Sequence, residues 1–99
     1  MTLTIKSRRP MKQENLQSLV QAALEREREK LLFAIMRTKE ELTRFEKRYR
    51  SSSVKFFRRY QTGKLDDRND YIDWAGEYQI YLILKEKLAN LRGLKVDGR

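Results

Sequence analysis

The sequence predicts an all-α protein in which a long helix, a short corner helix and a returning third helix form an antiparallel, coiled-coil-like hairpin. Residues 12–49 contain neither Gly nor Pro and place apolar side chains at helical spacing. Nine of the ten aromatic side chains lie between Phe45 and Tyr81, where they can form a shared core. Serines at 51–53 and glycines at 63 and 93 interrupt the helical pattern and divide the chain into three segments.

The long helix is predicted over residues 12–49. Its apolar seam advances by alternating steps of four and three residues, as in a coiled coil. At ~1.5 Å per residue the helix would be about 55 Å long. Because a helix of this length exposes its seam to water, we expect another helix to cover it. The seam residues are Leu31, Ile35, Thr38, Leu42, Phe45 and Tyr49.

The corner helix is predicted over residues 54–62. A serine directly before the apolar sequence VKFF can cap this helix, because its hydroxyl accepts a hydrogen bond from a free backbone N–H. Gly63 then offers a left-handed helix terminus. The corner helix therefore reverses the direction of the chain within a short stretch.

The third helix is predicted over residues 69–92 and ends at Gly93. Its first turn is acidic, which the helix dipole favours. The residues that can cap it are Asp66, Asp67 and Asn69. Its inner face, which would pack antiparallel on the long helix, carries Tyr71, Trp74, Tyr78, Tyr81, Leu84, Leu88 and Leu91.

The length of the third helix also predicts self-association. A helix of about 24 residues cannot reach the first part of the long helix, so an apolar stripe stays uncovered there. The stripe consists of Leu16, Leu19, Val20, Ala23 and Leu24. We therefore expect a homodimer or larger helical assembly through this part. The predicted divisions are a flexible basic arm (1–11), the helical hairpin domain (12–93) and a flexible tail (94–99).

Composition narrows the possible functions. The chain has no Cys and no His, which excludes disulfides, thiol nucleophiles, histidine acid-base chemistry and zinc sites of the usual kind. Four acids near the start of the third helix could hold Mg²⁺, but capping explains them without a metal: Asp66, Asp67, Asp70 and Asp73. We expect no enzymatic activity and no cofactor. Since no stretch is typical of a signal peptide or a membrane span, we also expect a cytoplasmic protein that does not contact membranes.

The net charge of +9 is unevenly distributed. Residues 1–12 and 51–64 contain basic side chains and no acid, whereas residues 65–78 are mainly acidic. Basic patches of this kind attract polyanions, so a nucleic-acid-binding module or a transcriptional autoregulator is one possible function. The candidate phosphate-binding residues are Arg48, Arg50, Lys55, Arg58 and Arg59. A solvated outer face of the corner helix explains the same residues equally well.

The aromatic segment supports a different function, namely protein binding. Tyr and Trp are enriched at interface hot spots, although the helical spacing of these rings also fits a core. Near the N-terminus, Leu3 and Ile5 alternate with polar residues and could add a strand to a partner. The candidate partner-binding residues are Leu3, Ile5, Phe57, Tyr60, Trp74 and Tyr78.

The arrangement of these aromatic residues and turn signals resembles a family of small all-helical bacterial and archaeal proteins predicted to be antitoxins of two-component toxin-antitoxin modules. The resemblance covers roughly residues 24–92 and depends on Phe45 and Tyr49, the serines, Phe56, Tyr60, Gly63 to Asp66, Tyr71, Asp73, Trp74, Tyr81 and Leu88. This chain is basic at Arg50, Lys55, Arg58 and Arg59, where members of the family are often acidic. The resemblance implies that the protein neutralises a cognate toxin by direct binding.

Overall fold

The structure is a computed structural model that describes residues 13–94. Within this range every regular element is a helix: α1 (Gln13–Tyr49), α2 (Ser53–Gln61) and α3 (Asn69–Arg92). The predicted all-α class and its three helices are therefore confirmed. Leu3, Ile5, the rest of the expected arm and nearly all of the expected tail lie outside the described residues.

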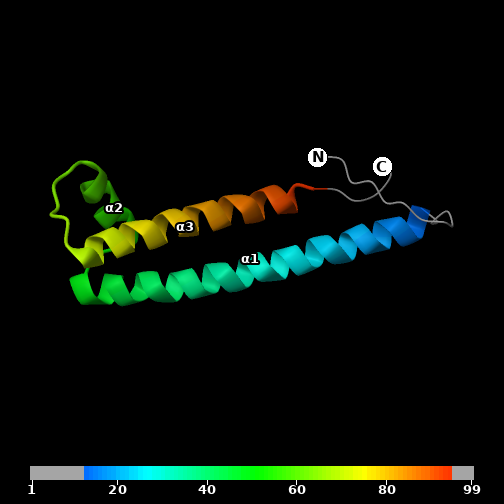
Figure 1. The fold of residues 1–99 in the computed structure, drawn as a ribbon, viewed down its shortest axis with the longest axis horizontal. Helices are drawn as coiled ribbons and strands as arrows, with labels where there is room; N and C mark the ends of the chain where they lie inside the picture. Colours follow the sequence, from blue (N-terminus) through cyan, green and yellow to red (C-terminus); the bar gives the residue numbers. More distant parts are fainter. Residues whose placement is uncertain (1–12, 95–99) are drawn as a thin grey trace.

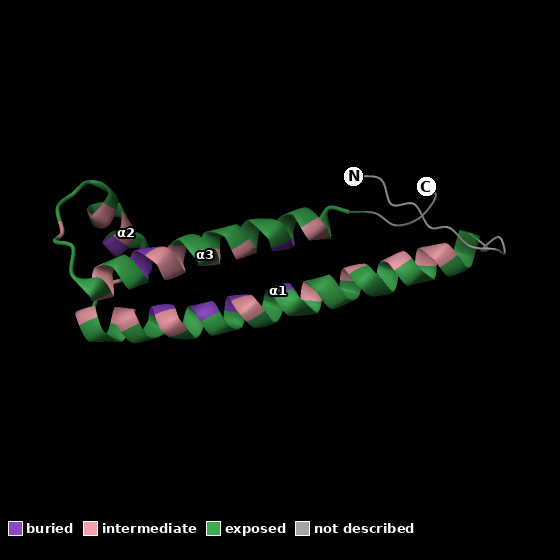
Figure 2. Cartoon of the chain, in the orientation of Figure 1, coloured by how far each residue is buried: buried purple, intermediate pink, exposed green. Residues whose placement is uncertain are grey.

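The helices α1 and α3 run side by side in opposite directions, and α2 covers one end of the pair (Figure 1). The predicted seam of α1 faces α3: Leu31, Ile35, Thr38 and Leu42 are buried, and Phe45 and Tyr49 are half-buried. Figure 2 shows the buried residues on the facing sides of the two helices, with exposed residues on their outer sides. The spacing of the apolar residues thus gave the correct inner face of α1.

The core consists of two clusters along the α1–α3 pair. The corner cluster, beside α2, consists of Leu42, Phe56, Trp74 and Ala75. The distal cluster, farther from α2, consists of Leu31, Ile35 and Leu88. Only the corner cluster is enclosed by all three helices.

Trp74 is the centre of the corner cluster. Only 1% of its surface is exposed, and its ring stacks on Phe56 with centroids 3.8 Å apart and planes 3° from parallel. The Trp74 Nε1–H donates a hydrogen bond to Ser53 Oγ at 2.9 Å. The Ser53 backbone N–H in turn donates to Glu46 Oε2 at 2.8 Å. Through Ser53, hydrogen bonds therefore connect all three helices.

The turns around α2 follow the predicted chemistry. Ser52 is the N-cap, and its hydroxyl accepts a hydrogen bond from the Lys55 N–H at 3.2 Å. After α2 ends, Gly63 adopts the left-handed conformation with φ 73°, which glycine reaches without strain. The end of α1 was not predicted in detail, because Arg50 adopts φ 51° there although it is not a glycine.

The cap of α3 differs from the prediction. Arg68 holds the N-cap position, and no side chain caps the helix. Asp66 accepts hydrogen bonds from the Arg68 backbone N–H at 3.0 Å and from the Arg68 guanidinium at 2.9 and 2.8 Å. Both oxygens of the Asp66 carboxylate are thus bonded to Arg68, two residues away, and Asp66 does not cap the first turn of α3.

Candidate protein-interaction surface

Three half-buried rings form an aromatic surface where α2 meets α3, here called the corner aromatic surface: Phe57, Tyr60 and Tyr78. The ring centroids of Phe57 and Tyr78 are 5.1 Å apart, and those of Phe57 and Tyr60 are 6.5 Å apart. Beside these rings, Val54 is 52% exposed. The structure therefore brings together three of the sequence-predicted partner-binding residues, with part of each ring accessible.

A shallow hollow adjoins this surface. Its lining comes from all three helices and includes Thr43 and Glu46 of α1, Val54 of α2, and Tyr78 and Tyr81 of α3. The lining of the hollow thus contains both apolar and polar groups. Such a combination can receive an apolar side chain of a partner and can also form hydrogen bonds around it.

Trp74, which the sequence analysis also proposed as a partner-binding residue, is not part of the corner aromatic surface. Its ring is buried, and its only N–H group already donates to Ser53. The expectation that Trp74 is partly exposed as a partner-binding residue was therefore wrong. Sequence spacing placed Trp74 and Tyr78 on one helix face, but rings of both α1 and α2 pack on Trp74 and bury it, while Tyr78 stays half-buried.

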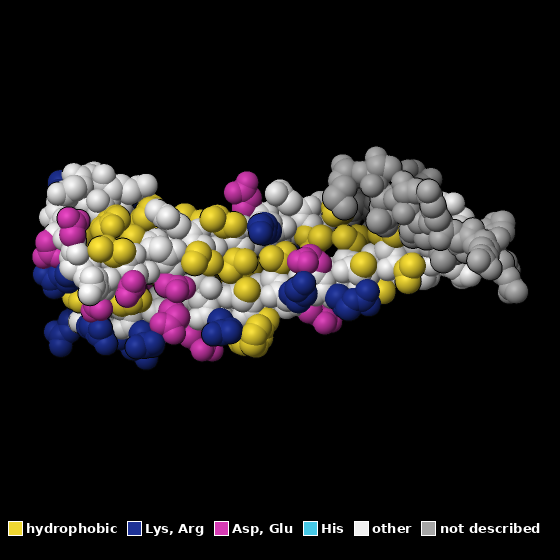
Figure 3. All heavy atoms as spheres, viewed as in Figure 1, with side chains coloured by type: hydrophobic (Ala, Val, Ile, Leu, Met, Phe, Trp, Pro, Cys, Tyr) yellow, Lys and Arg dark blue, Asp and Glu magenta, His cyan; other side chains and the backbone are white. Residues whose placement is uncertain are grey.

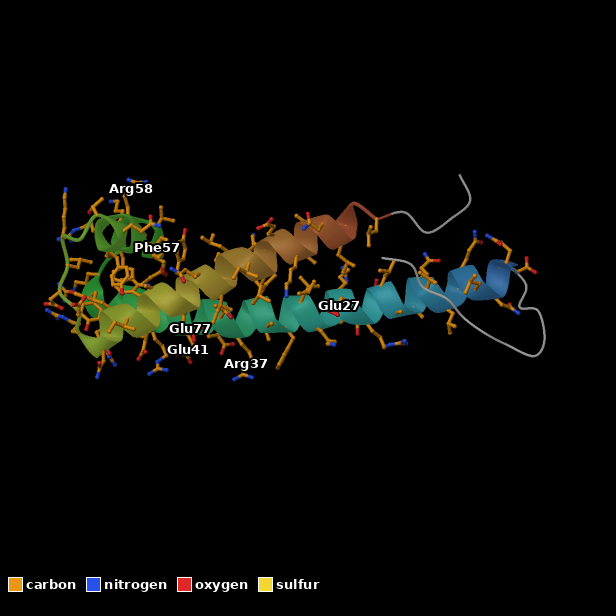
Figure 4. The ribbon with its side chains drawn as sticks, turned by 45° about the horizontal axis from the view of Figure 1, so that its top comes forward. Glu27, Arg37, Glu41, Phe57, Arg58 and Glu77 are labelled. Carbon is orange, nitrogen blue, oxygen red and sulfur yellow. The ribbon has the colours of Figure 1, made fainter. Side chains whose placement is uncertain are left out.

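Most of the predicted nucleic-acid-binding residues share one exposed surface. Lys55, Arg58 and Arg59 are all exposed on α2, and Figure 4 shows Arg58 on the outer side of α2 while Phe57 points toward α3. None of the three forms an ion pair with a residue in the described range. Arg50 is also exposed, in the turn after α1.

Arg48 does not belong to this basic group. Its Nη1 donates to Asp70 Oδ2 at 2.8 Å, along a furrow between α1 and α3. Its guanidinium is therefore already paired with a carboxylate. The sequence placed Arg48 close to Arg50, but the helix ends between them and their side chains have different surroundings.

The acidic start of α3 is held by neighbouring side chains. Asp70 Oδ2 accepts a hydrogen bond from the Tyr49 hydroxyl at 2.6 Å in addition to the bond from Arg48. The Tyr49 hydrogen bond, followed by the Arg48 hydrogen bond, lowers the pKa of Asp70 below its usual value of 3.8. Hydrogen bonds from Arg68 lower the pKa of Asp66 to about 2. In the described part of the chain, no three acidic side chains gather as metal ligands.

These lowered pKa values predict acid sensitivity. Above about pH 5 both carboxylates are charged in the folded and the unfolded chain. As the pH falls further, the unfolded chain binds protons first, so the free energy of unfolding decreases. We expect Asp70→Asn to make this decrease shallower below about pH 5. Urea unfolding at a series of pH values measures it.

Asp67→Asn is the matched control for Asp70→Asn. Asp67 is exposed and forms no hydrogen bond or ion pair with another residue of the range 13–94 through its side chain. Its replacement should leave the acid-induced loss of stability as steep as in the parent. Identical pH profiles for Asp70→Asn and the parent would show that the contacts of Asp70 do not contribute to folding.

A second set of apolar side chains, on the outside of the molecule, was not predicted from the sequence. On α1, Phe33 and Met36 are 58% and 50% exposed. On α3, Ile72, Ile80 and Ile83 are 48%, 47% and 52% exposed. Figure 3 shows hydrophobic side chains along α3 on the visible face, above a row of charged side chains. The signal was present in the sequence, because residues 72, 76, 80 and 83 also follow helical spacing.

Comparisons with protein families, curated proteins and solved structures found no match to this chain. No described helix combines the length and the apolar content that crossing a bilayer requires. The antitoxin interpretation therefore depends on the sequence resemblance alone.

Proposed function

We propose that this protein is a non-enzymatic binding protein that recognises another protein through its corner aromatic surface. The observation that carries the proposal is the clustering of Phe57, Tyr60 and Tyr78 as half-buried rings beside a hollow. A few partly exposed aromatic residues on a well-packed support contribute most of the binding energy in many interfaces. The core beneath them fixes their positions before binding, which lowers the entropic cost of association.

The sequence resemblance identifies the partner in this proposal as a cognate protein toxin, which the chain neutralises by direct binding. The hollow beside the corner aromatic surface is lined in part by Val54, Tyr78 and Tyr81, and the outer side of α2 carries Lys55, Arg58 and Arg59. A toxin surface with an apolar projection and acidic residues around it would complement both features. We further propose that α1 and α3 pair as in a coiled coil and that the chain self-associates.

A co-expression experiment with the product of the adjacent gene tests this function. Phe57→Ala and Tyr78→Ala should each weaken binding by about 30-fold or more, because each removes an aromatic contact of the hot-spot type. Toxicity of the adjacent gene product should then return in cells that express either variant. Isothermal titration with the purified proteins gives the affinities, and circular dichroism confirms that both variants keep their helices.

The matched control is the double variant Arg58→Gln, Arg59→Gln, which changes the outer side of the same helix. It should leave neutralisation nearly unchanged, since exposed charges contribute mainly to association rate. If this variant lost all neutralising activity while both aromatic variants kept it, protein recognition by the corner aromatic surface would be disproved.

Nucleic-acid binding is the second candidate function. The observation that favours it is that Lys55, Arg58 and Arg59 lie together on α2, unpaired within residues 13–94, and that the first turn of α2 has no acid. If this surface binds nucleic acid, the Arg58→Gln, Arg59→Gln variant should bind duplex DNA more weakly than the parent. The slope of its log affinity against log salt concentration should be smaller by about 0.9 for each phosphate contact that is lost. Equal salt dependence in the parent and the arginine variant would exclude this surface as a nucleic-acid site.

A further inference from the structure

The outer side of α3 carries an apolar face that the described chain covers only in part. Its isoleucines are Ile72, Ile80 and Ile83, each about half exposed. Helical spacing places Ile72 and Ile83 opposite the buried Trp74, and Ile80 lies at the flank of the helix, where it lines a furrow that α1 also borders. A helix with apolar residues on both sides normally has neighbours on both sides. Inside this chain, α1 and α2 cover the inner side, and α1 also borders the furrow that Ile80 lines, which leaves about half of each isoleucine exposed.

Gly76 lies within this outer face and has no explanation inside the chain. It occupies the middle of α3, where glycine weakens a helix relative to alanine. A Cβ atom at this position would meet nothing within 4 Å, and the backbone is not in the left-handed region. Neither packing nor conformation therefore requires a glycine here. Close approach of a backbone from another molecule would require one.

The charges on α3 indicate which molecule approaches. Asp73 lies seven residues before Ile80 and Lys87 seven residues after it. Seven residues are about two helical turns, so both charges lie on the same side of the helix as Ile80. Both are exposed, and neither forms an ion pair with a residue of the described range. Along α3 this row of side chains is thus apolar at its centre, acidic at one end and basic at the other. Arg44 and Arg48 of α1 line the same furrow as Asp73, and Glu27 of α1 lines the same hollow as Lys87.

We infer that a second copy of this chain packs antiparallel on the outer face of α3, with Ile80 of both copies at the two-fold axis. In this arrangement Asp73 of each copy lies opposite Lys87 of the other, so the interface contains two complementary ion pairs. A parallel arrangement would instead place like charges opposite each other. The charge pattern therefore favours a second copy in one orientation. This inference is independent of the proposed toxin binding, because the corner aromatic surface is not involved.

The interface differs from the self-association that the sequence predicts through the first part of α1, and sedimentation separates the two. We expect the parent to sediment as a dimer at tens of micromolar. Ile80→Glu with Ile83→Glu should raise the dimer dissociation constant by about 100-fold or more, because each places a charge in the apolar centre. Both positions are exposed in the single chain, so its helical circular dichroism should stay unchanged. Leu19→Glu on α1, where Leu19 is 51% exposed, is the matched control and should leave the dimer intact.

A charge exchange tests the antiparallel orientation. Asp73→Lys alone and Lys87→Asp alone should each weaken the dimer roughly fivefold or more, because two attractive pairs become repulsive. The double variant Asp73→Lys, Lys87→Asp restores both pairs and should regain most of the parent affinity. A monomeric parent, or a dimer that Leu19→Glu dissociates and the isoleucine variant does not, would overturn the inference. Additive losses in the double variant would also overturn it.

Discussion

Replacing Trp74 with Ala is expected to lower the free energy of unfolding by about 3 to 5 kcal/mol, because a fully buried aromatic side chain leaves a large cavity. Trp74 is 1% exposed and stacks on Phe56 at 3.8 Å. Its removal also leaves the Ser53 hydroxyl without its indole donor. Since small domains are stable by only about 5 to 15 kcal/mol, such a loss takes much of the total.

Urea unfolding followed by far-ultraviolet circular dichroism measures this loss, because the variant no longer contains the tryptophan that fluorescence would require. Trp74→Phe is the control. It keeps an aromatic ring against Phe56 but cannot donate to Ser53, so its stability should lie between those of the parent and Trp74→Ala. An unchanged unfolding midpoint for Trp74→Ala would contradict the buried position.

The two adjacent phenylalanines of α2 should differ strongly in their effect on stability. Phe56 is 3% exposed and lies against Trp74, whereas Phe57 is half-buried at the molecular surface. We expect Phe56→Ala to cost about 3 to 5 kcal/mol. Phe57→Ala should cost clearly less, because water can occupy much of the space that its ring leaves.

The same unfolding measurements compare both phenylalanine variants directly. They also test the basis of the proposed function, since a partner-binding residue has to be replaceable without unfolding the chain. Equal losses for Phe56→Ala and Phe57→Ala would mean that both rings belong to the core. Phe57 would then be unsuitable as evidence for a partner-binding surface.

Apolar spacing and turn chemistry predicted the helices well. The seam from Leu31 to Leu42 is buried, and both Ser52 and Gly63 act at the ends of α2 as their chemistry requires. These features are local: each depends on residues within a few positions, which a sequence displays directly. The left-handed Arg50 was missed because glycine and asparagine are the usual signals for that conformation.

The candidate surfaces were harder to predict, because exposure depends on distant segments. Trp74 and Tyr78 look equivalent on a helical wheel, yet α1 and α2 together bury the first and leave the second partly accessible. The sequence suggested that Arg48 is a free cation, but in the structure its guanidinium is paired with Asp70, at the start of α3. The outer isoleucines of α3 were not predicted, because only one apolar face was expected on each helix. Their helical spacing between residues 72 and 83 is nevertheless visible in the sequence.

The two core clusters differ in how strongly they resist local opening. Three helices and the hydrogen bonds of Ser53 hold the corner cluster together, while α1 and α3 alone enclose Leu31, Ile35 and Leu88. Local unfolding starts where the fewest buried contacts must break, so the chain should loosen first at the distal cluster. The C-terminal turns of α3 can then separate from α1 while the corner stays folded. In this molecule, partial unfolding would thus spare the surface proposed to bind a partner.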